Sequence, residues 1–166
     1  MVRSYGQPEK TAKNEMGRQG GFTFLGLMFA VAIAGIALAG TGALWQLESR
    51  REKEKELLFI GEEYRHAIGS YYEKSPGAVK QFPEKLADLL HDRRFPNPTH
   101  HLRRLYRDPM TVDGEWELIR QQGRIIGVAS RSSDKPIKIA GFTAEQEGFD
   151  SAASYADWYF IHNGLP

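Results

Sequence analysis

The residues best suited to chemistry in this 166-residue chain are acids and histidines beyond position 90. Four acids fall in one loop-like stretch, namely Asp134, Glu145, Glu147 and Asp150. Hard cations such as calcium bind where several carboxylate and carbonyl oxygens converge. Because these acids show no tight alternating pattern, we interpret them as solvated loop acids, with a calcium site as the alternative.

A histidine pair and a group of arginines are the other candidates for binding. Adjacent residues of a helix point about 100° apart, so His100 and His101 are not expected to share a metal ion. Five arginines form a local basic excess, which we interpret as a solvated surface; the alternative is a dock for an acidic partner or for DNA. These are Arg93, Arg94, Arg103, Arg104 and Arg107.

Catalysis leaves no recognisable pattern in the sequence. It contains no G-x-S-x-G, no H-E-x-x-H and no phosphate-binding glycine loop. The chain has no cysteine, which excludes disulfides, thiolate metal sites and a cysteine nucleophile. Since 22 basic residues nearly balance 21 acidic ones, net charge does not indicate a nucleic-acid partner. We therefore predict no enzyme, no catalytic or metal-binding residue, no cofactor and no nucleic acid.

The elements that carry these residues are organised around one apolar run. Residues 19–47 contain no charge, which is 29 consecutive positions. A bilayer core about 30 Å thick needs about 20 apolar helical residues, so we predict a transmembrane helix over 22–47. Residues 1–21 are polar and contain glycine, and we expect a leader that is removed. Basic residues are equally frequent close to both ends of the run, so they set no orientation.

The helix is expected to continue beyond the apolar run, because proline is absent from Phe22 to Ser75. Residues 48–56 are rich in helix formers and spaced for ion pairs three or four positions apart, which we interpret as a solvated helical face. Beyond them, apolar residues at steps of three and four form a stripe that can pack on a small sheet. The stripe is Leu57, Ile60, Tyr64, Ile68 and Tyr71.

Residues 76–166 are expected to form a globular α+β head, because Ser75-Pro76-Gly77 ends a stalk helix over 48–75. Two short helices are predicted, over 82–90 and, capped by Thr99, over 100–106. Two strands are predicted to form a hairpin around Gln121-Gln122-Gly123, over 115–120 and 124–130. Two further strands are predicted over 136–140 and 158–161.

The N-terminal edge of the apolar run carries a second signal. Two glycines precede Phe22-Thr23, and unbroken apolar sequence follows. This order resembles the class III signal of type IV pilins and type II secretion pseudopilins. The resemblance implies that a prepilin peptidase cuts between Gly21 and Phe22 and then N-methylates Phe22.

The order of segments after the run is similar to that of major pseudopilins: a stalk helix, a helical connection, and a short antiparallel meander opened by an Asp-Pro turn. The resemblance implies a pilin-like α+β fold, in which a long N-terminal transmembrane and stalk helix packs on a small antiparallel β-meander. It implies a single-pass inner-membrane protein with a cytoplasmic N-terminus and a periplasmic C-terminal head. The implied partners are the prepilin peptidase, other pseudopilin or pilin subunits, and the inner membrane.

One position departs from the family pattern. Most pilins and pseudopilins carry Glu at the fifth mature position, where this chain has Gly26. In the family, that carboxylate is thought to neutralise the terminal amine of a neighbouring subunit, which Gly26 cannot do. The sequence therefore predicts a minor structural subunit of a type II secretion pseudopilus or of a related type IV pilus-like machine.

Two alternatives start from other N-termini. Ala37-Leu38-Ala39 before Gly40 is similar to a signal peptidase site behind an apolar segment. Cleavage there predicts a secreted periplasmic binding protein or enzyme. A signal-anchored protein that is never cut is the other alternative. The first residue of the mature chain distinguishes the three hypotheses.

Overall fold

The computed structural model describes residues 20–97 and 99–163, apart from the side chains of 20–22 and 37–44. The chain divides into two compact units, Met1–Trp45 and Gln46–Pro166. The helix α1 (Gly20–Glu73) is 54 residues long and contributes to both units. Most of the predicted leader over 1–21 lies outside the described residues.

The membrane predictions are corrected by the properties of α1. Among the described residues, no helix combines the length and the apolar character that crossing a bilayer requires. The predicted transmembrane helix over 22–47 is therefore wrong, and so is the pilin-like α+β fold class built on it. The predicted single-pass location in the inner membrane is wrong for the same reason.

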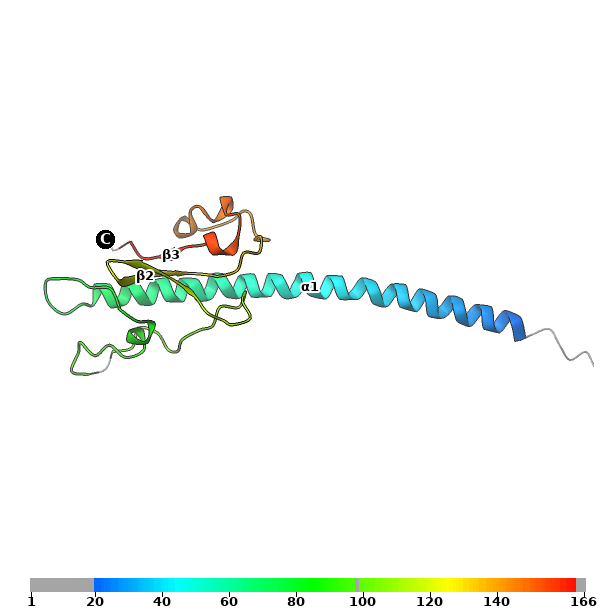
Figure 1. Ribbon diagram of the computed structural model, residues 1–166, viewed down its shortest axis with the longest axis horizontal. Helices are drawn as coiled ribbons and strands as arrows, with labels where there is room; N and C mark the ends of the chain where they lie inside the picture. The colour runs from blue at the N-terminus through cyan, green and yellow to red at the C-terminus, as the bar shows by residue number, and fades with distance from the viewer. Residues whose placement is uncertain (1–19, 98, 164–166) are drawn as a thin grey trace, which may run out of the picture. The chain divides into compact units, whose positions relative to one another are not determined.

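In the second unit, one face of α1 forms the core. The five predicted stripe residues are buried, none more than 7% exposed, so the periodicity of three and four is confirmed: Leu57, Ile60, Tyr64, Ile68 and Tyr71. Side chains from both sides of α1 close over this stripe, including Leu89 and Leu102 from the segment after the helix. Figure 1 shows that segment passing on one side of α1, with β2 and β3 on the other.

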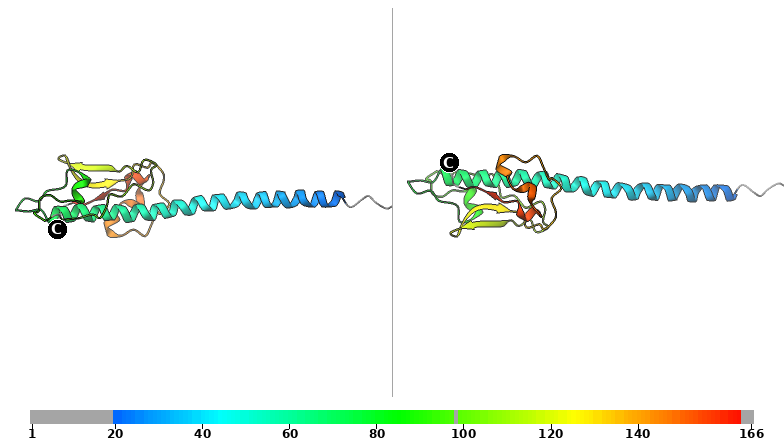
Figure 2. Two further views of the ribbon diagram at one scale, coloured as in Figure 1. Left: turned by 90° about the horizontal axis from the view of Figure 1, so that it is seen from below. Right: turned by 90° about the horizontal axis from the view of Figure 1, so that it is seen from above.

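A three-stranded antiparallel sheet packs against α1 in the order β1-β2-β3. Its strands are β1 (Glu117–Gln121), β2 (Arg124–Ala129) and β3 (Phe160–Ile161). Both views of Figure 2 place β1 and β2 on one side of the C-terminal half of α1. The predicted hairpin is confirmed. Its turn residues Gln122 and Gly123 have φ of 51° and 80°, as a two-residue type I′ turn requires.

The strand β3 comes very close to the backbone of α1 at two glycines. A Cβ on Gly61 would lie 2.4 Å from the ring of Phe160, and one on Gly69 would lie 2.8 Å from the His162 imidazole. Because glycine has no side chain, β3 and the residue after it can pack directly on the helix. The Phe160 ring is thereby 1% exposed.

Two predicted elements do not form, because other groups take their backbone hydrogen bonds. Residues 100–106 are not helical: Thr99 pairs with Asp92 in an isolated bridge, and the N–H groups of residues 101 and 102 both donate to the Leu89 carbonyl. Residues 136–140 do not form a strand, because the N–H groups of residues 137 and 138 donate to the Glu54 carboxylate.

The remaining short elements are 3-10 turns. The first, η1 (Leu86–Leu89), replaces the longer helix predicted over 82–90. Three more turns cross the C-terminal part of the second unit: η2 (Ala144–Gln146), η3 (Phe149–Ser151) and η4 (Tyr155–Asp157). The ring of Phe149 stacks on that of Trp158, with 5.3 Å between the ring centroids, so aromatic packing stabilises this segment. The strand predicted over 158–161 is shorter than expected, because only the two residues of β3 form it.

Candidate functional site

The predicted processing site lies at the start of α1. Gly21 and Phe22 belong to the helix as its second and third residues, and their side chains are outside the described part. Gly26 lies one turn further along. Apart from its chain neighbours and the backbone of its own helix, no atom of the described residues lies within 4 Å of the position that its Cβ would occupy. The surface around Gly26 is therefore open within this unit.

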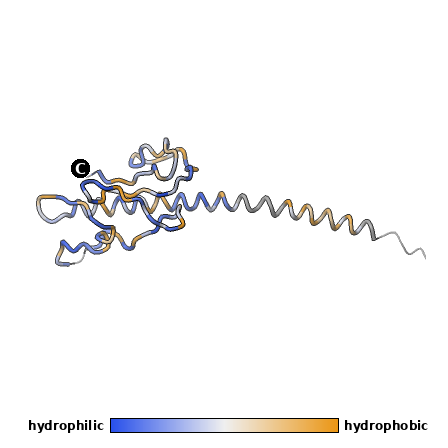
Figure 3. Tube along the Cα trace, in the orientation of Figure 1, coloured by the Kyte–Doolittle hydropathy of each residue, from blue (hydrophilic) through white to orange (hydrophobic). Residues whose placement is uncertain are grey.

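The first turns of α1 expose a continuous apolar surface. Eight large apolar side chains are between 55% and 76% exposed: Phe24, Leu25, Leu27, Met28, Phe29, Val31, Ile33 and Ile36. Their spacing, with steps of one, two and three, distributes them around the whole helix rather than along one stripe. Figure 3 shows this apolar part of α1 and the hydrophilic residues that follow it. A helix that is apolar on all sides is normally buried, so this surface requires cover.

The structure does not bring the four loop acids together. Asp134 lies 3.4 Å from an Arg50 nitrogen, whereas Glu145 pairs with Arg65 at 2.7 Å. Glu147 and Asp150 are exposed and line a surface hollow formed by residues 139–150. Among the described residues, the only group that meets the geometry of a metal site takes just Glu145 from this set. A calcium site built from all four acids therefore has no geometric support.

The two adjacent histidines have different surroundings, although the segment that carries them is not helical. The His100 Nδ1 contacts the Leu90 carbonyl oxygen, and its ring lies 4.9 Å from that of His91. The His101 ring is fully buried and bonds to other groups. Within the described residues, the pair shares no candidate metal site.

The arginine group also divides. Arg94 is not a solvated surface residue: its guanidinium donates to Asp92, to the Tyr71 carbonyl and to Ser75, and lies 3.5 Å from the centre of the Tyr71 ring. Arg104 and Arg107 line a surface hollow beside α1. The remaining two arginines, Arg93 and Arg103, are exposed. The basic excess in the sequence is thus one structural arginine and four surface residues.

A buried polar cluster around Asp92 was not predicted. The His101 Nε2 lies 3.2 Å from an Asp92 oxygen, and its Nδ1 lies 2.9 Å from the Ser70 hydroxyl. Because a carboxylate only accepts, Nε2 carries the proton and Nδ1 accepts from Ser70. The side chains of Asp92 and His101 are 0% exposed. These residue types could support nucleophilic catalysis, but here their burial favours a role in fixing the end of α1.

The charge states of this cluster follow from its contacts. Burial alone would raise the pKa of Asp92, but hydrogen bonds from the Arg94 side chain and N–H and from His101 lower it to about 2. Burial lowers the pKa of His101 below its usual 6.5, against the opposing influence of Asp92. The folded head therefore holds an ionised carboxylate beside a neutral imidazole at neutral pH.

We expect the head to lose stability in two steps as the pH falls. Below about 6.5, the unfolded chain binds protons at the histidines more readily than the folded one, because burial lowers the pKa of both His101 and His162. Between about pH 4 and pH 2, protonation of Asp92 removes about 2 kcal/mol, since its pKa falls from 3.8 to about 2 on folding. Urea denaturation at pH 7, 5, 4 and 2 measures both steps.

The variant Asp92→Asn provides the control for the acid step. It should be less stable than the native chain at pH 7, and its stability should change less between pH 4 and pH 2. An equal loss in both chains over that range would show that other acids cause the step.

A second buried acid, Glu54, was also missed. It is 5% exposed, and its carboxylate accepts hydrogen bonds from the N–H groups of Ile137 and Lys138 and from the Tyr155 hydroxyl. Burial raises the pKa of Tyr155, and the Glu54 carboxylate adds to this shift. The sequence did contain a signal: Glu54 precedes Leu57 by three positions and so continues the buried stripe by one step.

The chain was compared with protein-family models, curated proteins and solved structures. No family model, no curated protein and no solved structure matches the chain.

Proposed function

We propose that the chain is a structural subunit, of the minor type, in a type II secretion pseudopilus or a related type IV pilus-like assembly. A prepilin peptidase processes it between Gly21 and Phe22 and methylates Phe22. Its partners are that peptidase and other pseudopilin or pilin subunits. The resemblance of the sequence around Phe22 to the class III signal supports the processing step.

The observation that carries the proposal is the exposed apolar surface on the first turns of α1. Eight large apolar side chains between Phe24 and Ile36 are more than half exposed. Side-by-side packing with the equivalent helices of other subunits buries such a surface, at about 25 cal/mol for each Å² of apolar area. The same helix carries charged residues from Glu48 onwards, so the proposed apolar interface ends before that position.

The minor type of subunit is supported by Gly26. A glycine supplies no carboxylate to the terminal amine of a neighbour, and no side chain of the described residues lies within 4 Å of the position that its Cβ would occupy. A subunit that lacks this carboxylate can still pair its own terminal amine, at Phe22, with the Glu of a neighbouring subunit. It cannot offer the reciprocal contact, so it suits the end of an assembly.

Processing is tested by replacing Gly21 with leucine. The chain is produced together with a prepilin peptidase, and its intact mass is measured. We expect the native chain to begin at methylated Phe22 and Gly21→Leu to keep its leader, because only glycine lets the peptidase approach the backbone closely at this position.

The variant Gly26→Leu is the matched control, since it changes a glycine on the same helix that lies beyond the cleavage site. It should be processed like the native chain. Normal processing of Gly21→Leu would contradict the proposal. A mature chain that begins at Gly40 would favour a secreted binding protein or enzyme, and an uncut chain would favour a signal-anchored one.

A further inference from the structure

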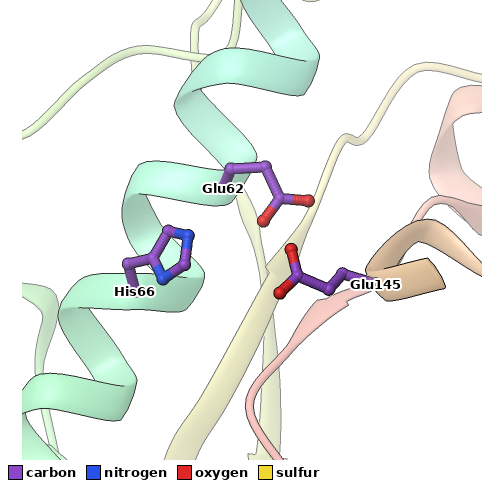
Figure 4. A group of neighbouring side chains, drawn as sticks. All are labelled: Glu62, His66 and Glu145. Carbon is purple, nitrogen blue, oxygen red and sulfur yellow. The ribbon is translucent and has the colours of Figure 1, made fainter. Parts of the chain in front are cut away.

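Three side chains with metal-binding atoms converge between α1 and η2. Glu62 and His66 lie four positions apart, so they occupy one face of α1 on successive turns. Glu145 reaches toward them from η2. The ligand atoms of all three residues lie within 4.8 Å of one another. Figure 4 shows the two carboxylates facing each other with the imidazole beside them.

A positive charge already links the two carboxylates. An Arg65 nitrogen lies 2.5 Å from a Glu62 oxygen and 2.7 Å from a Glu145 oxygen. Gln146 donates a further hydrogen bond, at 3.3 Å, to the other Glu62 oxygen. The hydrogen bond from Arg65 lowers the pKa of Glu145, so this carboxylate is ionised at neutral pH. The two carboxylates thus already hold one cationic group, the Arg65 guanidinium, between them.

The imidazole of His66 is available to complete such a site. In the part of the chain that the structure describes, no hydrogen bond or ion pair engages this exposed ring. Glu62 and Arg65 are mostly buried, with side chains 20% and 14% exposed, whereas the Glu145 side chain is 60% exposed. An ion can thus reach the group from the side of Glu145 without opening the core.

We propose that Glu62, His66 and Glu145 bind a divalent transition-metal ion of the zinc type, in competition with the Arg65 guanidinium. One imidazole nitrogen and two carboxylate oxygens suit zinc, cobalt or nickel ions. Calcium and magnesium prefer shells made of oxygen alone. The remaining coordination positions are open to water, and the ion ties η2 to α1 in place of the arginine.

Competition with Arg65 gives the site a distinctive signature. The guanidinium must leave the two carboxylates before an ion can bind both, and its charge repels a dication. Removing this charge should strengthen metal binding, although it removes two ion pairs that hold η2 on α1. A nonspecific surface site would also bind a cation more tightly without this charge, but it would not lose affinity when the His66 imidazole is removed.

The experiment is calorimetric titration of the full-length chain with zinc chloride. We expect one ion per chain, at least about tenfold weaker binding in His66→Ala and in Glu145→Gln, and tighter binding in Arg65→Gln. Magnesium and calcium chloride should bind far more weakly than zinc. Thermal unfolding of each variant without metal checks that the head is folded, and zinc should raise the melting temperature of the native chain.

The histidines His91 and His100 provide the matched control, because their rings lie 4.9 Å apart and could bind zinc by themselves. A variant with both replaced by alanine should keep the native affinity. Loss of binding in that variant would overturn the proposal, as would unchanged binding in His66→Ala or weaker binding in Arg65→Gln. The proposal does not depend on the proposed function, since processing at Gly21 is measured separately.

Discussion

The variant Glu54→Ala should unfold with a free energy at least about 3 kcal/mol smaller than that of the native chain. Its carboxylate is 5% exposed and accepts from the Ile137 N–H at 2.7 Å, the Lys138 N–H at 3.0 Å and the Tyr155 hydroxyl at 2.7 Å. Each buried donor left without an acceptor costs about 1–3 kcal/mol. Urea denaturation of the full-length chain measures the difference.

Two further variants test the assignment of this loss to the carboxylate. Glu54→Gln keeps one oxygen acceptor and should lose less stability than Glu54→Ala. Glu52→Ala is the matched control, because Glu52 lies on the exposed side of the same helix and pairs only with Lys55; no measurable change is expected. Equal stabilities for Glu54→Ala and Glu52→Ala would show that the buried contacts contribute nothing.

The second large effect is expected for Ile68→Ala. This side chain is 0% exposed and lies at the centre of the buried stripe. Truncating a buried isoleucine to alanine usually costs about 2–5 kcal/mol, because it removes apolar contacts and leaves a cavity. The melting temperature of the head should fall by several degrees, which circular dichroism can follow.

The control for Ile68→Ala is Phe59→Ala. Phe59 belongs to the same helix but is 61% exposed, so its truncation should leave the melting temperature of the head nearly unchanged. If both variants melted like the native chain, the stripe would not be the core of the head.

The parts of the fold that follow from local periodicity could be predicted from the sequence. The stripe from Leu57 to Tyr71 repeats every three or four positions, and the turn at Gln122-Gly123 carries its own conformational preference. Within each signal, the residues that carry it lie only a few positions apart in the chain. Both predictions are confirmed, because the tertiary contacts agree with these local preferences.

The parts that failed depend on distant partners. Residues 136–140 have the composition of a strand, but their N–H groups bond to Glu54, whose position on α1 no local pattern connects to them. Residues 100–106 lose their helix to the Leu89 carbonyl and to the pairing of Thr99 with Asp92. In both places, tertiary hydrogen bonds override local propensity.

The candidate sites divide in the same way. The proposed processing motif at Gly21-Phe22 could be predicted from the sequence, because a motif of this kind is one continuous segment. The group of Glu62, His66 and Glu145 could not be predicted, since two of its members share one helix face and the third lies some eighty positions later. The sequence places Arg94 in a basic surface. Its burial beside Asp92 depends on how the segment after α1 packs on that helix, which no local pattern predicts.

The close approach of β3 to Gly61 and Gly69 also sets the order of events during synthesis. Phe160 and His162 lie against the glycine surface of α1, and Glu54 meets Tyr155 across 101 positions. At about 5–20 residues per second, the finished helix waits on the order of 5–20 seconds for these partners to leave the ribosome. During that interval the parts of its surface that contact these late residues are uncovered, so the head completes its core only after nearly all of its sequence has been translated.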